Sequence, residues 1–457
     1  DGAVWTCPGL SFINCETGEK STFQGCVRDT NLNADGDDCV ANVSLISDGP
    51  INLTNARKAN QVVDFSTGGA IPFTLERTHN SNPHFSKMAN GSPPVLFFPM
   101  IDYSRFGRAW RSQFDTRVFK FGTNKLHFAM PNGRELVFGL SGGIWKPAYP
   151  FGSSNYIWLN GRKGLNMTVE VVGTDVFLTD QNDLVRVYDV NDGRLKELRY
   201  RGGYVQTLTY TGSLNTSIAD NLGRSMSFTY DADGYAQTMT APDGTVHKYV
   251  YATAYPQHGT LIDERKLTEV IHPDGTPGTD LDNPKTIYHY ENASFPIALT
   301  GITDERGVRF ATYAYNAEGE AISSQHAGGA DGYTVAYDDT SSPKTTTVTN
   351  ALGKDTVYNF DEYQGIRRLA SVEGVASTNC VASNETLAYD SNNFVNQRTD
   401  AEGRITKYTN NTRGLPTQII EGFGTPEART TNVTWHADYN LPTQIAAPGK
   451  TTDLVYD

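Results

Sequence analysis

Hydrophobic and polar residues alternate in short runs along the first part of the chain. Residues 71–78, 116–121, 125–130 and 135–140 each show this pattern, and Pro131-Asn-Gly133 separates the last two. A period of two turns one face of a strand toward a core and the other toward water, and Asn-Gly favours a tight hairpin. The pattern therefore predicts antiparallel strands. From residue 61 onward, no segment combines a helical period with caps at both ends.

From about residue 180 onward, the runs repeat at a spacing of about 21 residues. About seven residues rich in Thr, Val, Tyr and Ile lie between turns, which is enough for one strand. Each unit thus holds two strands and two turns, and the array comprises roughly ten to twelve units. A Tyr-Asp pair or a close relative ends one strand per unit, at Tyr188-Asp189, Tyr230-Asp231, Tyr337-Asp338, Phe360-Asp361, Tyr389-Asp390 and Tyr456-Asp457, with Tyr210, Tyr251, Tyr290 and Tyr315 in the same context.

A second signal accompanies the first: Asp or Asn, two variable residues, then Gly. The side-chain oxygen accepts a hydrogen bond from a backbone N–H two residues on, and Gly supplies the positive φ that closes the turn. Basic residues often follow and would screen the turn carboxylates. The motif occurs at Asp220 with Gly223, Asp231 with Gly234, Asp304 with Gly307, Asn316 with Gly319, Asn350 with Gly353, Asp400 with Gly403, and Asn411 with Gly414.

Stacked units would bring the repeat tyrosines into register. Side chains at equivalent positions of paired strands lie close enough to contact one another. We therefore expect a ladder of rings near one line of the sheet, on successive strands. Its members would be Tyr188, Tyr210, Tyr230, Tyr251 and Tyr315.

The repeat units resemble the YD repeats of the Rhs (rearrangement hotspot) family. The resemblance rests on Phe228-Thr-Tyr-Asp-Ala-Asp-Gly234 and Thr399-Asp-Ala-Glu-Gly-Arg-Ile-Thr-Lys-Tyr408. The stretch Asn132-Gly-Arg-Glu-Leu-Val-Phe-Gly-Leu-Ser-Gly-Gly-Ile-Trp145 resembles the segment that precedes such repeats. The similarity covers roughly residues 60 to 457, and it is more specific for family than for biochemical role.

The resemblance implies an all-β fold in which hairpin repeats spiral into part of a hollow shell. In that family the shell encloses a C-terminal toxin, so the expected function is a shell segment of a bacterial polymorphic toxin, secreted or at the cell surface. The expected partners are the remainder of the shell and its toxin. The family's self-cleavage signature is absent here, and the last repeat is incomplete. We therefore expect an open sheet edge that favours self-association.

Three regions differ in composition and residue pattern: a Cys-containing, loop-rich segment (1–60), a β-rich lead-in (61–180) and the repeat array (181–457). The formal net charge of −13 argues against a general nucleic-acid binder, which needs a basic face. No run of about 18 apolar residues exists, so no transmembrane helix is expected.

Four of the five cysteines lie within the first 40 residues: Cys7, Cys15, Cys26 and Cys39. Their spacing contains no C-x-x-C pair, which disfavours a zinc site. We expect two disulfides of undetermined connectivity, which stabilise a segment with little core and indicate an oxidising compartment. Four reduced thiols in a cytosolic protein are the alternative.

Oxygen-bearing side chains stand at alternate positions between residues 29 and 38. Gly36 is the sixth residue counted from Asn31, as in the first half of a calcium loop. Asn42 stands where a bidentate Glu would complete the loop, so we favour an acidic loop without metal. If calcium binds, its ligands are Asn31, Asn33, Asp35 and Asp37.

No motif predicts an enzyme. The histidines lack metal-ligand spacing, nucleophile elbows and phosphate loops are absent, and the carboxylates are explained as turn formers. No cofactor is required, and a glycosidase has no supporting motif. The alternative function is a carbohydrate-binding adhesin that recognises cell-surface glycans through aromatic platforms. The tryptophans that could form such platforms are Trp5, Trp110, Trp145, Trp158 and Trp435.

Overall fold

The computed structural model of the chain describes residues 6–7, 10–11, 51–81, 104–132, 135–148, 166–253, 265–274, 282–340, 342, 344–363, 366–377 and 381–456. Regular structure in these residues is almost entirely β, which confirms the predicted all-β fold class. Two short 3-10 turns, η1 (Arg201–Gly203) and η2 (Ala327–Gly329), interrupt it. In this part of the chain, no helix has the length and apolar character needed to span a membrane.

One sheet of 25 strands, which we call the wall, makes up most of the structure. Its strands follow one another in chain order, each paired antiparallel with the next, so every connection is local. The strands are β10 (Thr168–Val172), β11 (Asp175–Thr179), β12 (Val185–Asp189), β13 (Leu195–Arg199), β14 (Val205–Thr211), β15 (Leu214–Asp220), β16 (Ser225–Tyr230), β17 (Ala236–Thr240), β18 (Val246–Thr253), β19 (Arg265–Ile271), β20 (Lys285–His289), β21 (Gly301–Thr303), β22 (Arg309–Tyr315), β23 (Ala321–His326), β24 (Tyr333–Asp338), β25 (Lys344–Asn350), β26 (Asp355–Tyr363), β27 (Ile366–Gly374), β28 (Ser383–Tyr389), β29 (Val395–Thr399), β30 (Ile405–Asn410), β31 (Pro416–Glu421), β32 (Arg429–Trp435), β33 (Pro442–Ala447) and β34 (Lys450–Asp453).

Two smaller sheets precede the wall, and we call their described residues between 51 and 148 the lead-in. Their positions confirm the strands expected from the alternating runs. The first has the order β3 (Lys58–Ser66), β4 (Thr74–Ser81), β5 (Trp110–Ser112). The second has the order β6 (Arg117–Phe121), β7 (Lys125–Ala129), β8 (Glu135–Ser141), β9 (Ile144–Ala148), and a separate pair joins β1 (Thr6–Cys7) with β2 (Leu10–Ser11).

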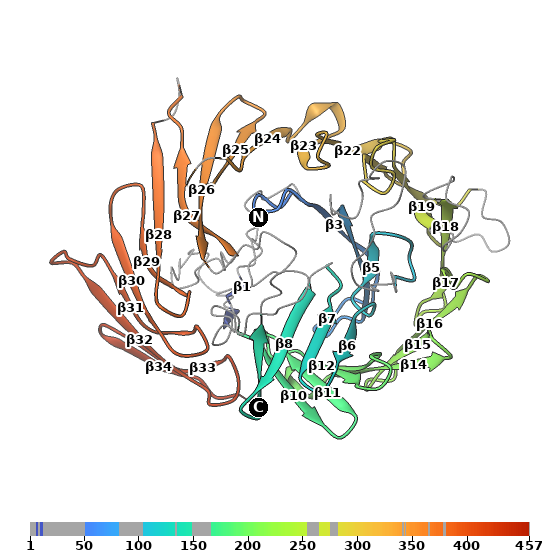
Figure 1. Ribbon diagram of the computed structural model, residues 1–457, viewed down its shortest axis with the longest axis horizontal. Coiled ribbons are helices and arrows are strands. Elements are labelled where there is room, and N and C mark those ends of the chain that lie inside the picture. Colours follow the sequence, from blue (N-terminus) through green and yellow to red (C-terminus); the bar gives the residue numbers. More distant parts are fainter. Residues whose placement is uncertain are drawn as a thin grey trace.

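The wall curves around the lead-in (Figure 1). β3, β5, β6, β7 and β8 lie inside the curve, and β14 to β34 follow its circumference. Two features generate the curvature: the right-handed twist of paired strands and the bulges that recur within the hairpins. The wall begins at Thr168.

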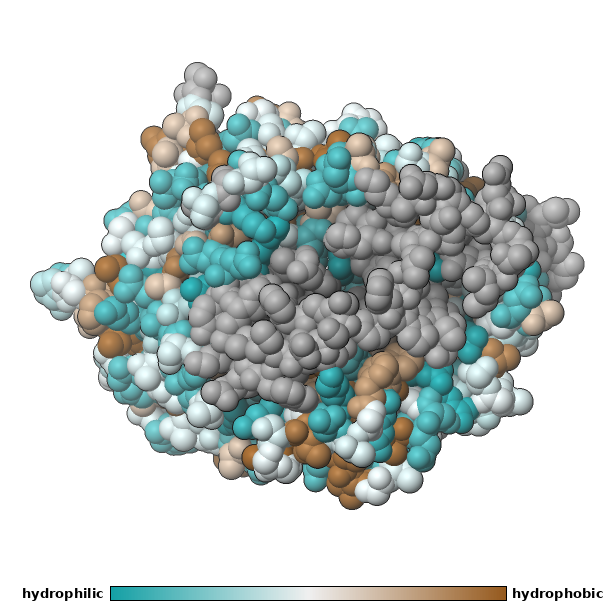
Figure 2. All heavy atoms as spheres, viewed as in Figure 1, coloured by the Kyte–Doolittle hydropathy of each residue, from teal (hydrophilic) through white to brown (hydrophobic). Residues whose placement is uncertain are grey.

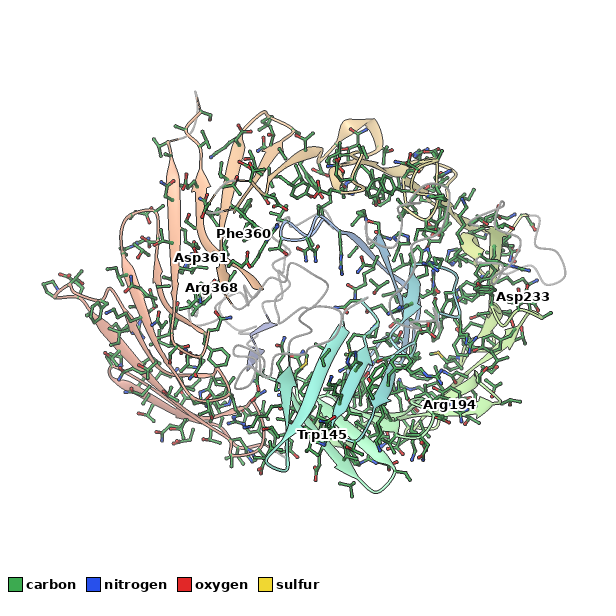
Figure 3. All side chains as sticks on the ribbon, in the orientation of Figure 1. Trp145, Arg194, Asp233, Phe360, Asp361 and Arg368 are labelled. Carbon is green, nitrogen blue, oxygen red and sulfur yellow. The ribbon has the colours of Figure 1, made fainter. Side chains whose placement is uncertain are left out.

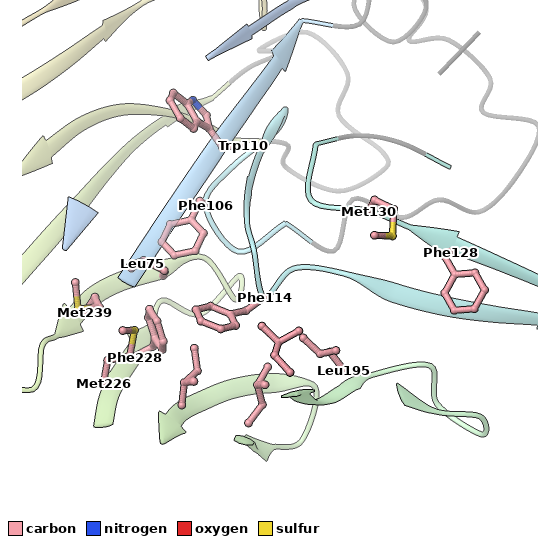
Figure 4. Close-up of a cluster of buried hydrophobic side chains, with 14 of the residues drawn as sticks. Leu75, Phe106, Trp110, Phe114, Phe128, Met130, Leu195, Met226, Phe228 and Met239 are labelled. Atoms are coloured by element: carbon pink, nitrogen blue, oxygen red, sulfur yellow. The ribbon is translucent and has the colours of Figure 1, made fainter. Parts of the chain in front are cut away.

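A continuous hydrophobic core joins the lead-in to the concave face of the wall. Leu75, Phe106 and Trp110 from the lead-in pack in one cluster with wall residues such as Phe228 and Met239 (Figure 4). A second cluster forms farther along the wall. It gathers Ile51, Leu53, Ala321, Tyr333, Val335, Val348, Tyr358, Phe360 and Leu369.

The inner and outer sides of the wall differ in composition. Phe360, on β26, lies on the inner side of the curve, and its side chain is buried (Figure 3). Hydrophilic residues dominate much of the described surface in view, with hydrophobic residues scattered among them (Figure 2). Buried and exposed side chains alternate along β14 and β16, so one face of these strands is packed and the other is exposed to solvent.

Candidate functional site: the laddered wall and its lining

A ladder of side-chain donors runs along the wall. The Tyr210 hydroxyl donates to the Leu195 carbonyl at 2.8 Å, and one repeat later Tyr230 donates to Asn215. The same bond recurs in later repeats even where the tyrosine is replaced. It joins Tyr251 to Ala236 (2.8 Å), Tyr315 to Leu299 (2.7 Å), Tyr337 to Ala321 (2.6 Å), Tyr389 to Leu369 (2.6 Å), Asn410 to Val395 (2.9 Å), Trp435 to Pro416 (2.9 Å) and Tyr456 to Pro442 (2.7 Å).

A register shift in the strand pairing accompanies the ladder residue in most repeats. It falls between Thr209 and Tyr210, and between Thr229 and Tyr230. A bulge bends the strand and re-aims a side chain, so it brings the ring to the carbonyl of the preceding hairpin. The expected tyrosines lie on every second strand rather than on successive strands, because each repeat contributes two strands. The contact that recurs along them is a hydrogen bond to a carbonyl of the preceding hairpin.

Tyr188 begins the ladder and links the wall to the lead-in. It is fully buried, and its hydroxyl lies 2.8 Å from the Thr116 hydroxyl, ahead of β6. Its ring packs against Phe128 on β7 at a centroid distance of 5.5 Å. Burial raises the pKa of Tyr188 to about 12, so the phenol keeps its proton and serves as a neutral hydrogen-bonding group.

The predicted turn residues are confirmed in their structural role. The Oδ1 atom of Asp220 accepts backbone N–H bonds from Leu222 and Arg224, and Gly223 donates its own N–H to the Asp220 carbonyl. The sequence predicts the bond from Leu222, which lies two residues after Asp220. The bond from Arg224, four residues after Asp220, is an additional finding. The same pattern holds at Asp231, Asp304 and Asp400.

The turn glycines have the expected positive φ, with +85° at Gly223, +86° at Gly234, +74° at Gly307 and +77° at Gly403. Arg224 and Arg404 pair with Asp220 and Asp400, each at 2.7 Å, so the basic residue screens the carboxylate of its own turn. These carboxylates are occupied by turn N–H groups and guanidinium groups, as the turn interpretation requires.

A buried ion pair fixes the lead-in to the wall. Arg77 on β4 and Asp64 on β3 are both buried, with Arg77 Nη2 2.7 Å from Asp64 Oδ1. Two wall tyrosines complete the network: Tyr249 donates to Asp64 at 2.9 Å, and Arg77 donates to the Tyr288 hydroxyl at 3.2 Å. The guanidinium also lies 4.6 Å from the Trp110 ring centroid. Partners on several sides offset much of the cost of burying this pair.

A buried lysine lies near this network. Lys58 is fully buried, and its Nζ lies 3.8 Å from the centroid of the Tyr313 ring on β22. Burial lowers the pKa of Lys58 well below its ordinary value. Nζ also donates to the Ala59 carbonyl at 3.3 Å.

Residues 51–57 attach the lead-in to a later part of the wall. Ala321 donates its backbone N–H to the Ala56 carbonyl at 2.9 Å. Thr346 and Arg367 donate side-chain hydrogen bonds to the carbonyls of Leu53 and Thr54, both at 2.8 Å. The lead-in thus bridges wall strands that are far apart along the sheet.

The two ends of the wall meet at a contact that we call the seam. It joins the turn at residues 180–184 to the turn at residues 436–441. The Asn440 backbone N–H lies 3.0 Å from Asp183 Oδ2, and its side-chain Nδ2 donates to the Gln181 carbonyl at 2.9 Å. Asp183 and Asn440 are 7% and 3% exposed. Residues 257 positions apart are therefore buried together, so turns near the two ends of the wall meet, although the sheet is not closed into a barrel.

Burial raises the pKa of Asp183, although the Asn440 N–H and the charge of Arg201 act in the opposite direction. Asp183 also has a positive φ of 60°, which Asp tolerates better than most residues. The sequence does not mark Asp183 or Asn440, because a contact between residues so far apart leaves no local signal. Asp64, Arg77 and Lys58 are not among the predicted site residues either.

A signal for the buried charges was nevertheless present. Leu75, Arg77 and His79 alternate along β4, so Arg77 continues the buried face that Leu75 begins. The period of two that predicted the strand also assigns the charged residue to the core face.

Most tryptophans proposed for glycan stacking serve the core or the ladder. Trp110 is fully buried, and its indole N–H donates to the Tyr290 hydroxyl at 2.8 Å. Trp145 packs against the first core cluster, and Trp435 is a ladder donor. Trp5 and Trp158 lie outside the described residues.

The side chains of the N-terminal candidates are not described either. Cys7 falls within β1, but its side chain is not described, and neither are Cys15, Cys26 and Cys39. The calcium candidates Asn31, Asn33, Asp35 and Asp37 share this segment. Disulfide pairing and calcium binding therefore stay predictions. Within the described residues, no group of three or more His, Cys, Asp or Glu side chains could hold a metal ion.

Comparison with known proteins gives one family match and several distant structural similarities. Residues 48–138 match the model of a domain of unknown function, DUF6531. No curated protein matches the chain. Among solved structures, TcdB2-TccC3-TEV is 10% identical with a TM-score of 0.35, and the match covers 89% of this chain and 23% of that one.

Two other structures show similarly low scores. The Tc holotoxin pore of Photorhabdus luminescens is 11% identical with a TM-score of 0.25, over 86% of this chain and 21% of that one. The N-terminal domain of the effector SpvB from Salmonella typhimurium strain LT2 is 14% identical with a TM-score of 0.18, over 72% and 100%. The chain spans less than a quarter of the first two, and the scores are too low to carry a functional argument.

Proposed function

We propose that this chain forms part of the wall of a hollow shell that encloses another polypeptide. The observation that carries the proposal is the seam: a sheet one layer thick returns on itself, so that Asp183 meets Asn440. A wall of this kind separates a lined interior from water. The enclosed polypeptide would be the C-terminal toxin of an Rhs-type polymorphic toxin, and the remainder of the shell would be the other partner.

The proposal is structural rather than enzymatic. The repeated carboxylates already accept turn N–H bonds, and Asp400 is also paired with Arg404. A general acid or base needs a free position for substrate beside the carboxylate. We accordingly propose a protein without catalytic turnover and without a required cofactor.

A glycan-binding adhesin has less support. Sugar stacking requires an exposed aromatic face, whereas Trp110 is buried and Trp435 is committed to the ladder. A bacterial protein that is secreted or displayed at the cell surface remains part of the proposal, since a toxin shell acts outside the cell that makes it.

Encapsulation can be tested by protease protection. A small reporter domain with a single site for a sequence-specific protease is fused after Asp457, through a short linker in one protein and a long flexible linker in another. If the wall encloses the reporter, cleavage should be roughly tenfold slower with the short linker, because the site is accessible only after local opening.

A variant with a broken ladder provides the control. Replacing both Tyr230 and Tyr251 with Ala removes two adjacent ladder rings, and the short-linker reporter should then be cleaved as fast as the long-linker one. Equal cleavage of both fusions in the unmodified wall would refute encapsulation.

A further inference from the structure

Three histidines lie where the lead-in packs against the wall. His79 is on β4, His247 is on β18, and His272 directly follows β19. The His247 ring packs edge-on against Phe65 of β3 at a centroid distance of 6.5 Å, and its centroid lies 5.6 Å from that of His272. All three imidazoles thus belong to the interface between the two layers.

The surroundings of His79 accommodate a neutral ring. His79 is fully buried, its Nε2 lies 3.0 Å from the Ile297 carbonyl, and its Nδ1 has no hydrogen-bond partner. The carbonyl fixes the proton on Nε2, and the ring packs edge-on against Trp110 at 5.2 Å. A second proton on Nδ1 would create a buried cation without a partner, which is strongly unfavourable.

The pair on the wall is similarly arranged. His247 is 5% exposed, and its Nδ1 has no hydrogen-bond partner. His272 Nε2 lies 2.9 Å from the Thr286 hydroxyl, which itself donates to Glu305. The hydroxyl therefore accepts the proton of His272 Nε2. Protonation of both rings would place two cations side by side.

Charged groups on the neighbouring elements act in both directions. Lys58 of β3 opposes a proton on His79, and Arg77 of β4 opposes one on His247 or His272. Carboxylates favour protonation: Asp64 acts on both wall histidines, Asp243 on His247 and Glu305 on His272. Glu305 Oε1 lies 3.5 Å from His272 Nε2.

We propose that mild acid releases the lead-in from the wall by protonating His79, His247 and His272. The release would uncover the concave face while the wall itself stays folded. The inference rests on the interface between lead-in and wall, and it holds whether or not the wall encloses a toxin.

The direction of the pH effect follows from the shifts in pKa. Burial is the largest cause in each case, and it lowers the pKa of His79 to about 3 and the pKa of His247 and His272 below the ordinary value of 6.5. The released state binds more protons than the packed state, so the packed state is fully stable above pH 6.5 and weakens progressively below it. Burial raises the pKa of Asp115 to about 6, so this carboxyl stabilises the packed state as the pH falls and opposes the trend. The experiment must therefore measure stability strand by strand.

Hydrogen exchange measured by mass spectrometry on the full chain, between pH 7 and pH 4.5, supplies that local readout. After correction for intrinsic exchange rates, strands β3 and β4 should lose protection at least tenfold, whereas the wall strands β18 to β20 and β30 to β33 keep theirs. Loss of protection in all strands together, or full protection of β3 and β4 at pH 4.5, would overturn the proposal.

Substitutions separate protonation from general acid lability. His79→Gln, His247→Gln and His272→Gln keep a side-chain N–H donor but cannot titrate, so each should move the transition to lower pH. The triple variant should move it farthest, and the single variants carry the test if the triple does not fold. His326→Gln is the matched control, because the His326 ring stacks on the exposed Phe310 and pairs with the exposed Asp331. An unmoved transition in all three single variants would also refute the proposal.

Discussion

Each ladder tyrosine contributes both a packed ring and a hydrogen bond, and substitution can separate the two. For Tyr230 the ring packs against the first core cluster, and the hydroxyl donates to the Asn215 carbonyl. Tyr230→Phe should lower the free energy of unfolding by about 1 kcal/mol, and Tyr230→Ala by about 3 kcal/mol or more. Urea unfolding followed by circular dichroism measures both. Equal losses for the two variants would show that the ring is not packed.

Two turn glycines have similar backbone angles, but replacing them with Ala should lower the free energy of unfolding by different amounts. Gly223 and Gly414 have φ values of +85° and +78°, so Ala at either should cost about 1 kcal/mol in backbone strain. A Cβ at Gly414 would lie 2.3 Å from the Phe394 ring, whereas at Gly223 nothing lies within 4 Å. Gly414→Ala should therefore cost a further 1–3 kcal/mol, roughly, from overpacking. Thermal unfolding of both variants tests this, and equal melting temperatures would contradict the packing of Phe394.

At the level of single residues, the sequence predicted the groups whose role is local. The turn residues Asp220 and Gly223 could be identified because their partners lie within four positions of them. Arg77 and Asp64 could not be assigned as a buried pair, because Tyr249 and Tyr288 come from wall strands far along the chain. Charge alone would place Arg77 at the surface. Only its position two residues after Leu75, on the same face of β4, indicates that it is buried.

The repeating element is a two-strand unit whose turn is organised by one side-chain oxygen. Asp400 Oδ1 accepts the N–H groups of Glu402 and Arg404 at 3.1 and 2.9 Å. Asp400→Ala should cost about 1–2 kcal/mol, because two turn donors lose their acceptor. Asp400→Asn keeps that acceptor and loses only the exposed pair with Arg404, so it should cost less than about 1 kcal/mol.

The same two variants test the absence of catalysis. The unfolding midpoint should be lower for Asp400→Ala than for Asp400→Asn. Neither substitution should abolish hydrolysis of a polysaccharide substrate, because no such activity is expected of the unmodified chain. A specific hydrolytic activity present in the unmodified chain and lost in both variants would overturn the structural role.

At the level of elements, the sequence predicted the strands and the turns between them. Alternation marks strands and Asx-Gly marks turns, and both signals are local. The bulge beside most ladder residues could not be predicted, because nothing in the identity of Thr229 or Tyr230 specifies that two residues of one strand lie opposite one residue of its partner. The placement of the ladder on every second strand follows from this geometry together with the two-strand repeat.

For the whole molecule, closure of the wall depends on small rotations accumulated over many strands. Each pair of strands contributes twist, and each bulge adds a bend, so the end of the wall reaches its beginning only if all increments are of suitable size. A sequence indicates that an array curves but not where it closes. The Asp183–Asn440 contact therefore required the structure, while the spiral as such was implied by the resemblance to YD repeats.

The seam should respond to acid in the opposite direction from the interface of the lead-in. Because burial raises the pKa of Asp183, the folded state binds that proton more tightly than the unfolded state, and its carboxyl favours closure as pH falls. Asn440→Asp would remove the Nδ2 donor to the Gln181 carbonyl and place a second carboxylate beside Asp183. At pH 7 this variant should destabilise the seam by about 2 kcal/mol, and the loss should become smaller as the pH falls, because protonation of either carboxyl removes the repulsion between two charges.

Hydrogen exchange at residues 180–184 and 436–441 measures this effect. Each variant is compared with the unmodified chain at the same pH, so that any change caused by release of the lead-in is common to both and cancels. The double variant Asp183→Asn with Asn440→Asp restores a single charge and should recover much of the protection at pH 7. Unchanged exchange at both turns in Asn440→Asp would mean that the ends of the wall close through other contacts. Recovery of protection in the double variant would instead assign closure to this pair, since a general loss of stability at residue 440 could not be reversed by a substitution 257 positions away.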